Sequence, residues 1–220
     1  MKKIAILLII VSLFSYPVFA SNKNFDLKKK YVALSFDDGP SKYTNDIINY
    51  LYENDCQATF FVLGNKLSYY QDTLNNMISK NNEIANHTYS HPWLTHLNNN
   101  EILEEINKTQ DLIINITGYT PKLFRPSYGD INKKLRNLIK LNIVLWTNDS
   151  SDWKYKSSKT IASNVIRHIK ENDIILMHDT YKRTRDALKI IIPKLKELNY
   201  EVITISELLE IKELREIYRY

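Results

Sequence analysis

Short apolar runs alternate with helix-like stretches along most of this chain, and that alternation constrains the fold more than any other feature. Seven runs rich in β-branched and aromatic residues are typical of buried strands; they cover residues 31–36, 57–63, 83–86, 122–125, 142–147, 173–177 and 200–204. Helical apolar spacing lies between most of them, over residues 44–53, 98–115, 131–140, 158–170, 187–198 and 206–218. Repeated strand-then-helix units predict a parallel sheet with helical crossovers. Seven such units indicate an incomplete or distorted β/α barrel, and a doubly wound open sheet is the alternative that periodicity leaves open.

The first twenty residues have the pattern of a secretory signal peptide. Two lysines follow Met1, residues 4–19 are mostly apolar, and Val18-Phe19-Ala20 is a small-x-small cleavage signal. We expect cleavage after Ala20, and therefore a secreted, periplasmic or cell-envelope protein of a bacterium with no stable membrane span after cleavage. An uncleaved membrane anchor is the alternative, but Ser15 and Pro17 interrupt a run that is already short for a span.

The rest of the chain has the length of a single domain. We expect residues 21–30 to form a linker and residues 31–220 to form one domain, which acts as a monomer. The formal net charge of +5 falls by two without the lysines of the signal peptide, which is too small for a nucleic-acid-binding protein. Cys56 is the one cysteine, so no intramolecular disulfide can form, and its apolar neighbours predict a small buried side chain.

Ionisable residues follow five of the expected strands, in each case at the C-terminal end of the strand. In chain order they are Asp37 and Asp38, His87 and His91, Arg125, Asp149 and Asp152, and His178. The C-terminal ends of the strands form the face that carries active sites in β/α architectures. A solvated Asp-Asp-Gly-Pro turn explains the first pair when it is taken alone, because these residues favour turns. Five strands that end in this way predict a functional site on one rim.

Two of these residues, His87 and His91, are four positions apart and would share one face if their segment turns helically. Two imidazoles and one carboxylate form a three-ligand set that leaves a position open for water, as in catalytic zinc sites. The Asp pair on the same rim supplies the carboxylate, so we predict a divalent-metal site. A His-x-x-x-His pair alone is a weak signal, and a surface or capping role is its alternative. His96 and His168 have no such partner in the sequence, and we expect structural roles for both.

The remaining residues of the rim fit the parts of a hydrolytic site. A bound metal lowers the pKa of water and polarises a carbonyl, and a nearby carboxylate can act as general base. The leaving group needs an acid, and His178 is the one histidine left on the rim. Asp152 could orient His178, and Arg125 could pair with an acid. Taken singly, Arg125 could equally be a structural ion-pair partner, Asp152 a turn cap and Trp153 a core aromatic.

Five ordered motifs resemble the polysaccharide deacetylases of carbohydrate esterase family 4, whose domain is the NodB homology domain. The motifs are Ser-Phe-Asp-Asp-Gly-Pro at 35–40, His-Thr-Tyr-Ser-His at 87–91, Phe-Arg-Pro-Ser-Tyr-Gly at 124–129, Asp-Ser-Ser-Asp-Trp at 149–153 and Leu-Met-His at 176–178. The resemblance covers about residues 31–205. It implies a single-domain α/β fold, the distorted (β/α)7 barrel, with residues 31–220 as the catalytic domain.

The resemblance also implies roles for the residues of these motifs. Asp37 would be the catalytic base, oriented by Arg125, and His178 would be the catalytic acid, tuned by Asp152. One divalent ion, Zn²⁺ in the first place and Co²⁺, Ni²⁺ or Mn²⁺ as alternatives, would be held by Asp38, His87 and His91. The backbone N–H of Tyr128 would donate to the oxyanion of the substrate. The side chains of Trp153 and Leu176 would line the pocket for the acetyl group.

Two positions depart from the family's pattern, and neither removes a catalytic side chain. Ser127 stands where the family often has a second proline, and Ala85 replaces a common glycine. The resemblance thus implies a metal-dependent hydrolase that removes N-acetyl groups from the N-acetylglucosamine units of peptidoglycan, a chitin-type glycan or poly-N-acetylglucosamine and releases acetate. The expected partner is therefore an N-acetylated glycan.

Two other functions are compatible with the same motifs. An esterase that removes O-acetyl groups, as from xylan, would use the same residues. A secreted carbohydrate-binding domain without turnover would keep the fold but lack a base or a metal ligand, and none is missing from the sequence.

Overall fold

The structure, a computed structural model, describes residues 25–217. The predicted signal peptide of residues 1–20 lies outside the described residues. Phe25 and Leu27, near the end of the expected linker, pack against a buried cluster that includes Tyr31 and Ile205. Among the described helices, none combines the length and the apolarity that crossing a membrane requires.

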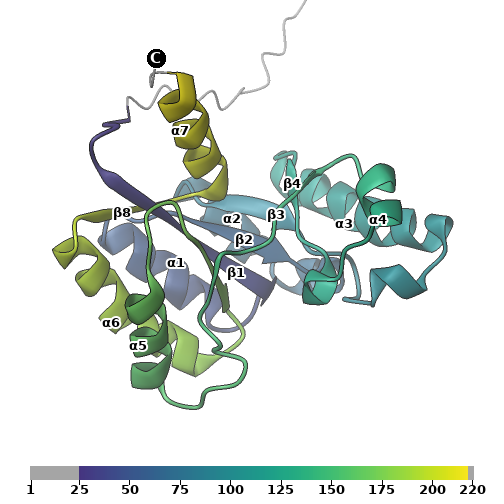
Figure 1. Ribbon diagram of the computed structural model, residues 1–220. Coiled ribbons are helices and arrows are strands. Elements are labelled where there is room, and N and C mark those ends of the chain that lie inside the picture. The colour runs from purple at the N-terminus through teal and green to yellow at the C-terminus, as the bar shows by residue number, and fades with distance from the viewer. Residues whose placement is uncertain (1–24, 218–220) are drawn as a thin grey trace, which may run out of the picture.

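Eight strands form one parallel sheet at the centre of the molecule (Figure 1). In chain order they are β1 (Lys30–Gly39), β2 (Ala58–Val62), β3 (Glu83–Asn86), β4 (Leu123–Phe124), β5 (Asn142–Ile143), β6 (Asn148–Asp149), β7 (Ile174–His178) and β8 (Tyr200–Ile203). Their spatial order is β5-β4-β3-β2-β1-β7-β6, and β8 pairs with the N-terminal part of β1. The seven strand regions predicted from the sequence are all present, and the distorted (β/α)7 barrel is confirmed.

Within residues 25–217, seven helices follow or separate these strands. They are α1 (Thr44–Glu53), α2 (Gln71–Ser79), α3 (Asn99–Thr117), α4 (Lys133–Leu138), α5 (Ser158–His168), α6 (Lys182–Glu197) and α7 (Ile205–Ile217), with short 3-10 turns η1 (Gly64–Tyr69), η2 (Leu94–His96) and η3 (Ser127–Gly129). Helix α2 was not expected from the sequence, because Leu74 and Met77 are nearly its whole apolar face. Helix α6 begins five residues earlier than expected, because its first turn is polar.

Strand β1 shows how the core is divided between its two faces. Successive strand residues point to opposite sides, and Val32, Leu34 and Phe36 belong to the large cluster between the sheet and the outer helices. Tyr31 and Ala33 belong to the smaller cluster on the other side, together with residues of α7. Asp37 continues this second set, so the strand alternation directs its side chain toward the inner face of the sheet.

The segment expected as one strand over residues 142–147 is instead divided between two partners. The N–H of Val144 donates to the carbonyl of Phe124 in β4 (2.9 Å), whereas the N–H of Thr147 donates to that of Ile174 in β7 (3.0 Å). The chain therefore crosses from one edge of the sheet to the other between these two residues. The prediction of a single strand was wrong because periodicity does not reveal a change of partner.

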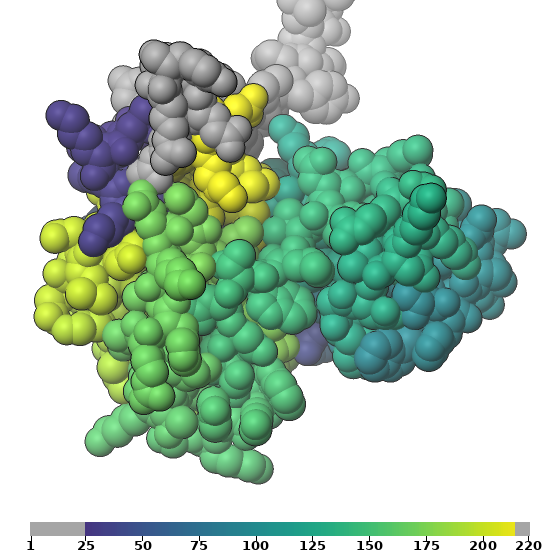
Figure 2. All heavy atoms as spheres, in the orientation of Figure 1, coloured from purple at the N-terminus to yellow at the C-terminus, as the bar shows by residue number. Residues whose placement is uncertain are grey.

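Two groups of helices flank the C-terminal ends of the strands, α3 and α4 on one side and α5 and α6 on the other (Figure 1). In the space-filling view the two groups are separated by a notch, at the floor of which atoms of the purple, N-terminal part of the chain reach the surface (Figure 2).

Candidate functional site

The end of β1 brings two adjacent carboxylates to one place. Regular strand geometry would send Asp37 and Asp38 to opposite faces, but the register shifts between Asp37 and Gly39, and Asp38 has a positive φ of 69°. This bulge turns Asp38 back toward the rim. As a result, both carboxylates approach Nε2 of His87, Asp37 at 3.7 Å and Asp38 at 3.5 Å.

The loop after β3 carries the two histidines, and it is not helical. Thr88 and His91 have positive φ values of 72° and 65°, so the condition of a helical turn over residues 87–91 is not met. The loop nevertheless brings the imidazoles together, with ring centroids 5.0 Å apart. The hydroxyl of Thr88 accepts a hydrogen bond from the N–H of His91 (3.1 Å), which ties the two ends of the turn together.

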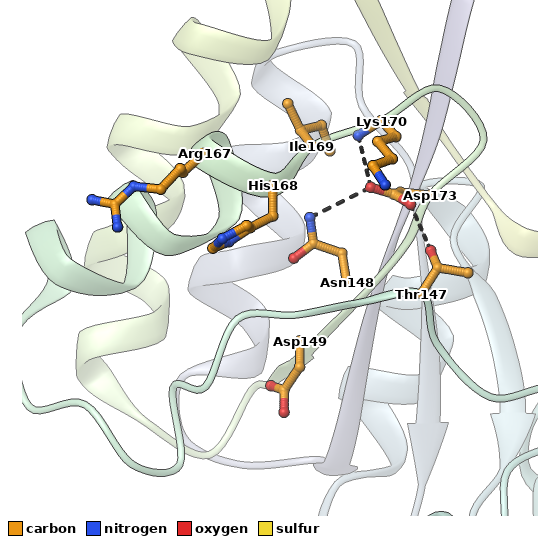
Figure 3. Close-up of a pocket in the computed structure, with 8 residues that line it drawn as sticks. All are labelled: Thr147, Asn148, Asp149, Arg167, His168, Ile169, Lys170 and Asp173. Carbon is orange, nitrogen blue, oxygen red and sulfur yellow. Dashed lines mark hydrogen bonds between the residues drawn. The ribbon is translucent and has the colours of Figure 1, made fainter.

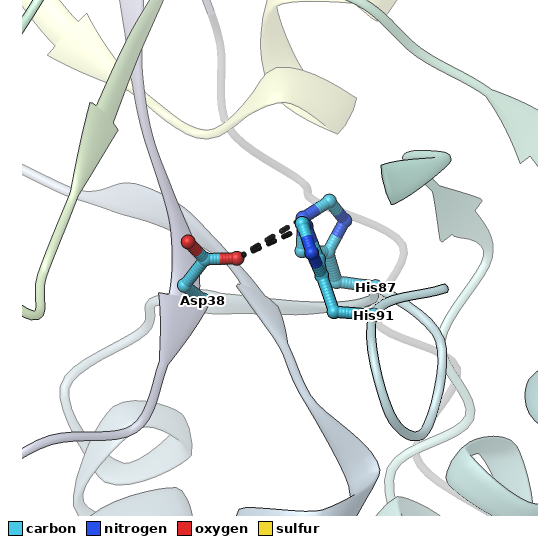
Figure 4. Close-up of side chains that lie close together, drawn as sticks. All are labelled: Asp38, His87 and His91. Atoms are coloured by element: carbon cyan, nitrogen blue, oxygen red, sulfur yellow. Dashed lines mark ion pairs between the residues drawn. The ribbon is translucent and has the colours of Figure 1, made fainter. Parts of the chain in front are cut away.

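Asp38, His87 and His91 form the one group of described residues whose ligand atoms are close enough to hold a metal ion, within 4.8 Å of one another (Figure 4). Oδ1 of Asp38 lies 3.5 Å from Nε2 of His87 and 3.3 Å from Nε2 of His91. This oxygen is buried and has no hydrogen-bond partner, which is costly unless a cation or donor satisfies it. The residues present therefore fit a divalent ion.

The orientation of His87 supports the same conclusion. Its Nδ1 lies 2.7 Å from the carbonyl oxygen of Arg125, a contact that requires a proton on Nδ1. Nε2, which faces Asp38, then keeps its lone pair, as a metal-ligating histidine needs. Burial and the neighbouring His87 lower the pKa of His91, which favours its neutral, ligating form.

Arg125 lies fully buried beneath the rim. Its Nη1 donates to Asp37 Oδ1 (2.7 Å) and to the hydroxyl of Ser35 (2.9 Å). Its Nε and Nη2 donate to the carbonyls of Val144 (3.2 Å) and Leu145 (3.0 Å). The guanidinium also lies over the ring of Phe61, 4.0 Å from the centroid. Arg125 thus fixes Asp37 and the segment that crosses the edge of the sheet at the same time.

His178, at the end of β7, pairs in register with Asp37 of the neighbouring strand β1 and also approaches the metal-ligand group. Its Nδ1 is 2.7 Å from Oδ1 of Asp152, and its Nε2 is 4.0 Å from Oδ2 of Asp38. Asp152 is fully buried, and its Oδ2 also accepts from the His178 N–H (2.7 Å) and from Thr184 (2.5 Å). Burial lowers the pKa of His178, but the hydrogen bond and charge of Asp152 outweigh it and raise the pKa to about 9. His178 is therefore protonated at neutral pH.

The three predicted substrate residues are Tyr128, Trp153 and Leu176, which belong to the motifs at 124–129, 149–153 and 176–178. Tyr128 lies in η3 with a positive φ of 60°, and its ring is 4.4 Å from that of His91. The backbone hydrogen bonds of that turn are donated by the N–H groups of Gly129 and Asp130. The N–H of Tyr128 takes part in neither of them. Trp153 is 56% exposed, and Leu176 is buried in β7.

A second hollow lies between β6 and α5 and is separate from the rim just described. It is lined by Thr147, Asn148, Asp149, Arg167, His168, Ile169, Lys170 and Asp173 (Figure 3). Asp173 accepts hydrogen bonds from the Thr147 hydroxyl and the Lys170 N–H (both 2.8 Å), so the centre of this hollow is structural. His168 contacts the carbonyl of Asn164 (2.9 Å) and, like His96, lies outside the metal-ligand group.

A family model described as polysaccharide deacetylase matches residues 24–143, more than half of the chain. The chain belongs to the polysaccharide deacetylase family. Its first three motifs lie within this match, and the resemblance seen in the sequence is confirmed.

Two curated polysaccharide deacetylases illustrate the similarity. The chain is 45% identical over 192 residues to the peptidoglycan-N-acetylmuramic acid deacetylase PdaC of Bacillus subtilis, covering 87% of this chain and 41% of that protein. It is 36% identical over 180 residues to the peptidoglycan-N-acetylglucosamine deacetylase PgdA of Listeria monocytogenes, covering 81% and 39%. The chain thus spans about two-fifths of the length of these relatives.

A solved structure of the peptidoglycan deacetylase PdaC from Bacillus subtilis superposes on this polysaccharide deacetylase fold with a TM-score of 0.85 and 44% identity. The match covers 87% of this chain and 96% of the solved chain. The fold is therefore shared along nearly the whole described length.

Sequence reasoning assigned no role to two acids that support the site. Glu105 of α3 accepts hydrogen bonds from the N–H groups of Tyr89 and Ser90 (both 2.8 Å) and from the Ser90 hydroxyl (2.7 Å), so it holds the histidine loop. Asp179 is fully buried, and burial raises its pKa to about 7. It accepts from Thr44 (2.5 Å) and lies so close to Gly39 that any Cβ there would collide with its carboxylate. Only the position of Asp179, directly after His178, could have suggested a role.

Proposed function

We propose that this chain is a metal-dependent hydrolase that removes N-acetyl groups from N-acetylglucosamine units, or a related N-acetylated sugar, in a bacterial cell-wall glycan and releases acetate. One observation carries the proposal. The metal-ligand group of Asp38, His87 and His91 is approached both by an arginine-paired carboxylate, Asp37, 3.7 Å from His87, and by an aspartate-paired imidazole, His178, 4.0 Å from Asp38. Hydrolysis of an amide needs a base on one side of the carbonyl and an acid on the other.

The residues divide into a proton acceptor and a proton donor. Asp37 lies 3.7 Å from His87 and is fixed by Arg125, so it can take the proton of the attacking water. His178 carries a proton at neutral pH, so it can give that proton to the departing amine. When bound by Asp38, His87 and His91, a divalent ion supplies a positive charge that acidifies water and polarises the acetyl carbonyl.

The proposed substrate contacts follow from the same arrangement. The Tyr128 N–H would donate to the oxyanion, since the backbone hydrogen bonds of its own turn are donated by the next two residues, Gly129 and Asp130. Trp153 and Leu176 would line the pocket for the acetyl methyl group. Leu176 lies beside Asp149 and Ser35 in the sheet, next to His178, and Trp153 directly follows Asp152.

The metal and the setting are part of the proposal. Two imidazoles and a carboxylate suit Zn²⁺ first, with Co²⁺, Ni²⁺ and Mn²⁺ as further candidates. Residues 1–20 would act as a signal peptide and residues 31–220 as the catalytic domain, exported to the cell envelope or beyond and active as a monomer. The names of the two curated relatives, which act on peptidoglycan, support a cell-wall glycan as the substrate.

The replacement of Asp37 by Asn tests the function. Asparagine keeps the shape of the side chain but accepts no proton, so acetate release should fall by about 10²–10⁴-fold while bound zinc, measured by elemental analysis, stays at the wild-type level. Unchanged turnover in this variant would contradict the proposal. Acetate release from peptidoglycan and chitin-type oligosaccharides, compared with acetylated xylan, separates N-deacetylation from O-acetyl esterase activity.

A further inference from the structure

Two large aromatic side chains lie exposed and stacked on each other beside the rim. The rings of Trp93 and Tyr128 are nearly parallel, with an interplanar angle of 12° and centroids 4.1 Å apart. Trp93 is 48% exposed and Tyr128 is 52% exposed. Single exposed aromatic residues are common, but adjacent ones that form a continuous apolar patch mark binding sites.

This aromatic pair is continuous with the metal-ligand group. The Tyr128 ring lies 4.4 Å from that of His91, in an edge-on arrangement, and His91 lies 3.3 Å from Asp38. At the far end, the His96 ring lies 6.1 Å from that of Trp93. A row of rings therefore leads outward from the reaction site over the side formed by the loops after β3 and β4.

Contacts between those two loops hold the pair in place. The hydroxyl of Thr95 donates to the carboxylate of Asp130, and the amine of Lys134 donates to the carbonyl of Leu97 (2.7 Å). Leu94, next to Trp93, is fully buried, and Ile131 packs against the same cluster. The two loops are thus fixed to each other, so a ligand does not have to order the stacked rings when it binds.

The chemistry of the pair fits a sugar ring. A β-linked pyranose presents C–H groups on its faces and hydroxyl groups around its edge, and amphipathic aromatic side chains offer an apolar ring with a polar tip. Nucleobases stack on similar surfaces, but their phosphates require a positively charged groove. The end of this row of rings at the reaction site instead contains the carboxylates of Asp37 and Asp38, which would repel a phosphate backbone.

We propose that Trp93 and Tyr128 form a subsite for the N-acetylhexosamine ring next to the one that is deacetylated. This inference rests on the proposed function, because it places the second ring by its distance from the metal-ligand group. The subsite would make the enzyme prefer chains over short fragments, and most of this preference would come from Trp93, which has no part in the proposed chemistry.

The test compares substrates of increasing length. Acetate release is measured with N-acetylglucosamine oligomers of two to six units for the wild type, Trp93→Ala and Trp93→Phe. In the wild type KM should fall as the oligomer lengthens. Trp93→Ala should raise KM for the longer oligomers by about three- to tenfold, the effect of one lost aromatic contact, and leave kcat within about twofold. Trp93→Phe, which keeps a ring, should retain most of the wild-type dependence on length.

Tyr52→Ala is the matched control, because Tyr52 is also an exposed aromatic residue but lies near the end of α1 that is remote from the rim. It should leave every KM unchanged. A Trp93→Ala variant with wild-type KM for all oligomers, or with an equal loss for the shortest and the longest, would overturn the subsite.

Equilibrium binding separates the subsite from the proposed reaction. The hexamer is titrated calorimetrically into the Asp37→Asn variant and into the Asp37→Asn, Trp93→Ala double variant. Weaker binding by the double variant supports the subsite even if the wild type releases no acetate, in which case only the proposed function fails. Equal binding by both, or no binding by either, contradicts the subsite even if the wild type is an active deacetylase.

Discussion

His178 lies between two carboxylates that contact its two nitrogens differently. Nδ1 shares a hydrogen bond of 2.7 Å with Asp152, whereas Nε2 faces Asp38 across 4.0 Å. The first contact fixes the ring and places the transferable proton on Nε2, which points to the metal-ligand group. Because the pKa of His178 is raised to about 9, the acid form is present at neutral pH and is lost as the pH rises through that value.

The first prediction concerns the alkaline limb of the pH profile. In Asp152→Asn the charge that stabilises the imidazolium is removed, while the burial that lowers the pKa of His178 remains. The alkaline limb of kcat/KM for acetate release should move to lower pH by about one to three units. Asp186→Asn, at an exposed surface pair with Lys182 and Arg185, should not move it. A profile with the same alkaline limb in Asp152→Asn would show that His178 is not the acid.

The second prediction concerns the buried guanidinium. Arg125 donates four hydrogen bonds, to a carboxylate, a hydroxyl and two backbone carbonyls. A lysine has a single ammonium group and cannot donate to all of these acceptors. Arg125→Lys should lower the free energy of unfolding by about 3 kcal/mol or more, because Asp37 loses its buried partner. Urea denaturation measures this change, and Arg136→Lys, at an exposed position of α4, is the control. A loss as small as that of the control would contradict the structural role.

At the level of elements, helix α3 supports the metal site although it supplies no ligand. Glu105 reaches from the helix to the loop and accepts three hydrogen bonds from Tyr89 and Ser90, between the two histidines. The capping box formed by Asn98 and Glu101 fixes where this helix begins. The loop can therefore keep two residues with positive φ, Thr88 and His91, in the conformation that points both imidazoles at Asp38.

The third prediction follows from this support. Glu105→Gln replaces the charged hydrogen bonds from the N–H groups of Tyr89 and Ser90 by weaker ones to a neutral amide oxygen. Zinc affinity of the metal-free protein, measured by calorimetric titration, should fall by about tenfold or more, as for other residues that orient metal ligands. Glu104→Gln, the same substitution at the exposed neighbouring position, is the matched control. Equal zinc affinity in the two variants would refute the role of Glu105.

At the scale of the whole molecule, the metal site and the hydrophobic core are separate contributors to stability. The largest buried cluster lies between the sheet and the outer helices and includes none of the metal-ligand group. The fold should therefore persist without the ion, while the bound ion adds its binding free energy to the stability of the native state.

The fourth prediction is that chelation lowers the melting temperature without unfolding the protein at room temperature. With zinc at 100 times its dissociation constant the shift should be about 5–10 °C. Far-UV circular dichroism at 25 °C should not change, and added zinc should restore both the melting temperature and acetate release. An identical melting temperature with and without chelator would show that the ion is not bound in the native state.

The positions of the strands along the chain and the choice of rim residues could be predicted from the sequence because both depend on local patterns. Apolar runs of strand length and their polar ends are visible in single segments, and the motifs around Asp37, His87 and His178 fixed the family. The predicted metal-ligand residues do lie together. Their roles in the reaction remain predictions.

The remaining features depend on contacts between distant residues. The bulge that turns Asp38 toward the rim, the positive φ values of the histidine loop and the change of partner between Val144 and Thr147 leave no periodic signal. Glu105 is one of several acids in a helix, and only the packing of α3 against the loop shows which one contacts it. Helix α2 was missed because its apolar face is small.

The crossing segment has a consequence for how related sequences should be compared. Arg125 contacts Val144 and Leu145 through their carbonyl oxygens, not through their side chains. Another apolar side chain at Val144, which packs in a buried cluster, or a substitution at Leu145 would therefore leave the carbonyl acceptors of the guanidinium in place. Insertions or deletions there would instead move the acceptors themselves. Among homologues, segment length between β5 and β6 is thus a better indicator of retained activity than sequence identity in that segment.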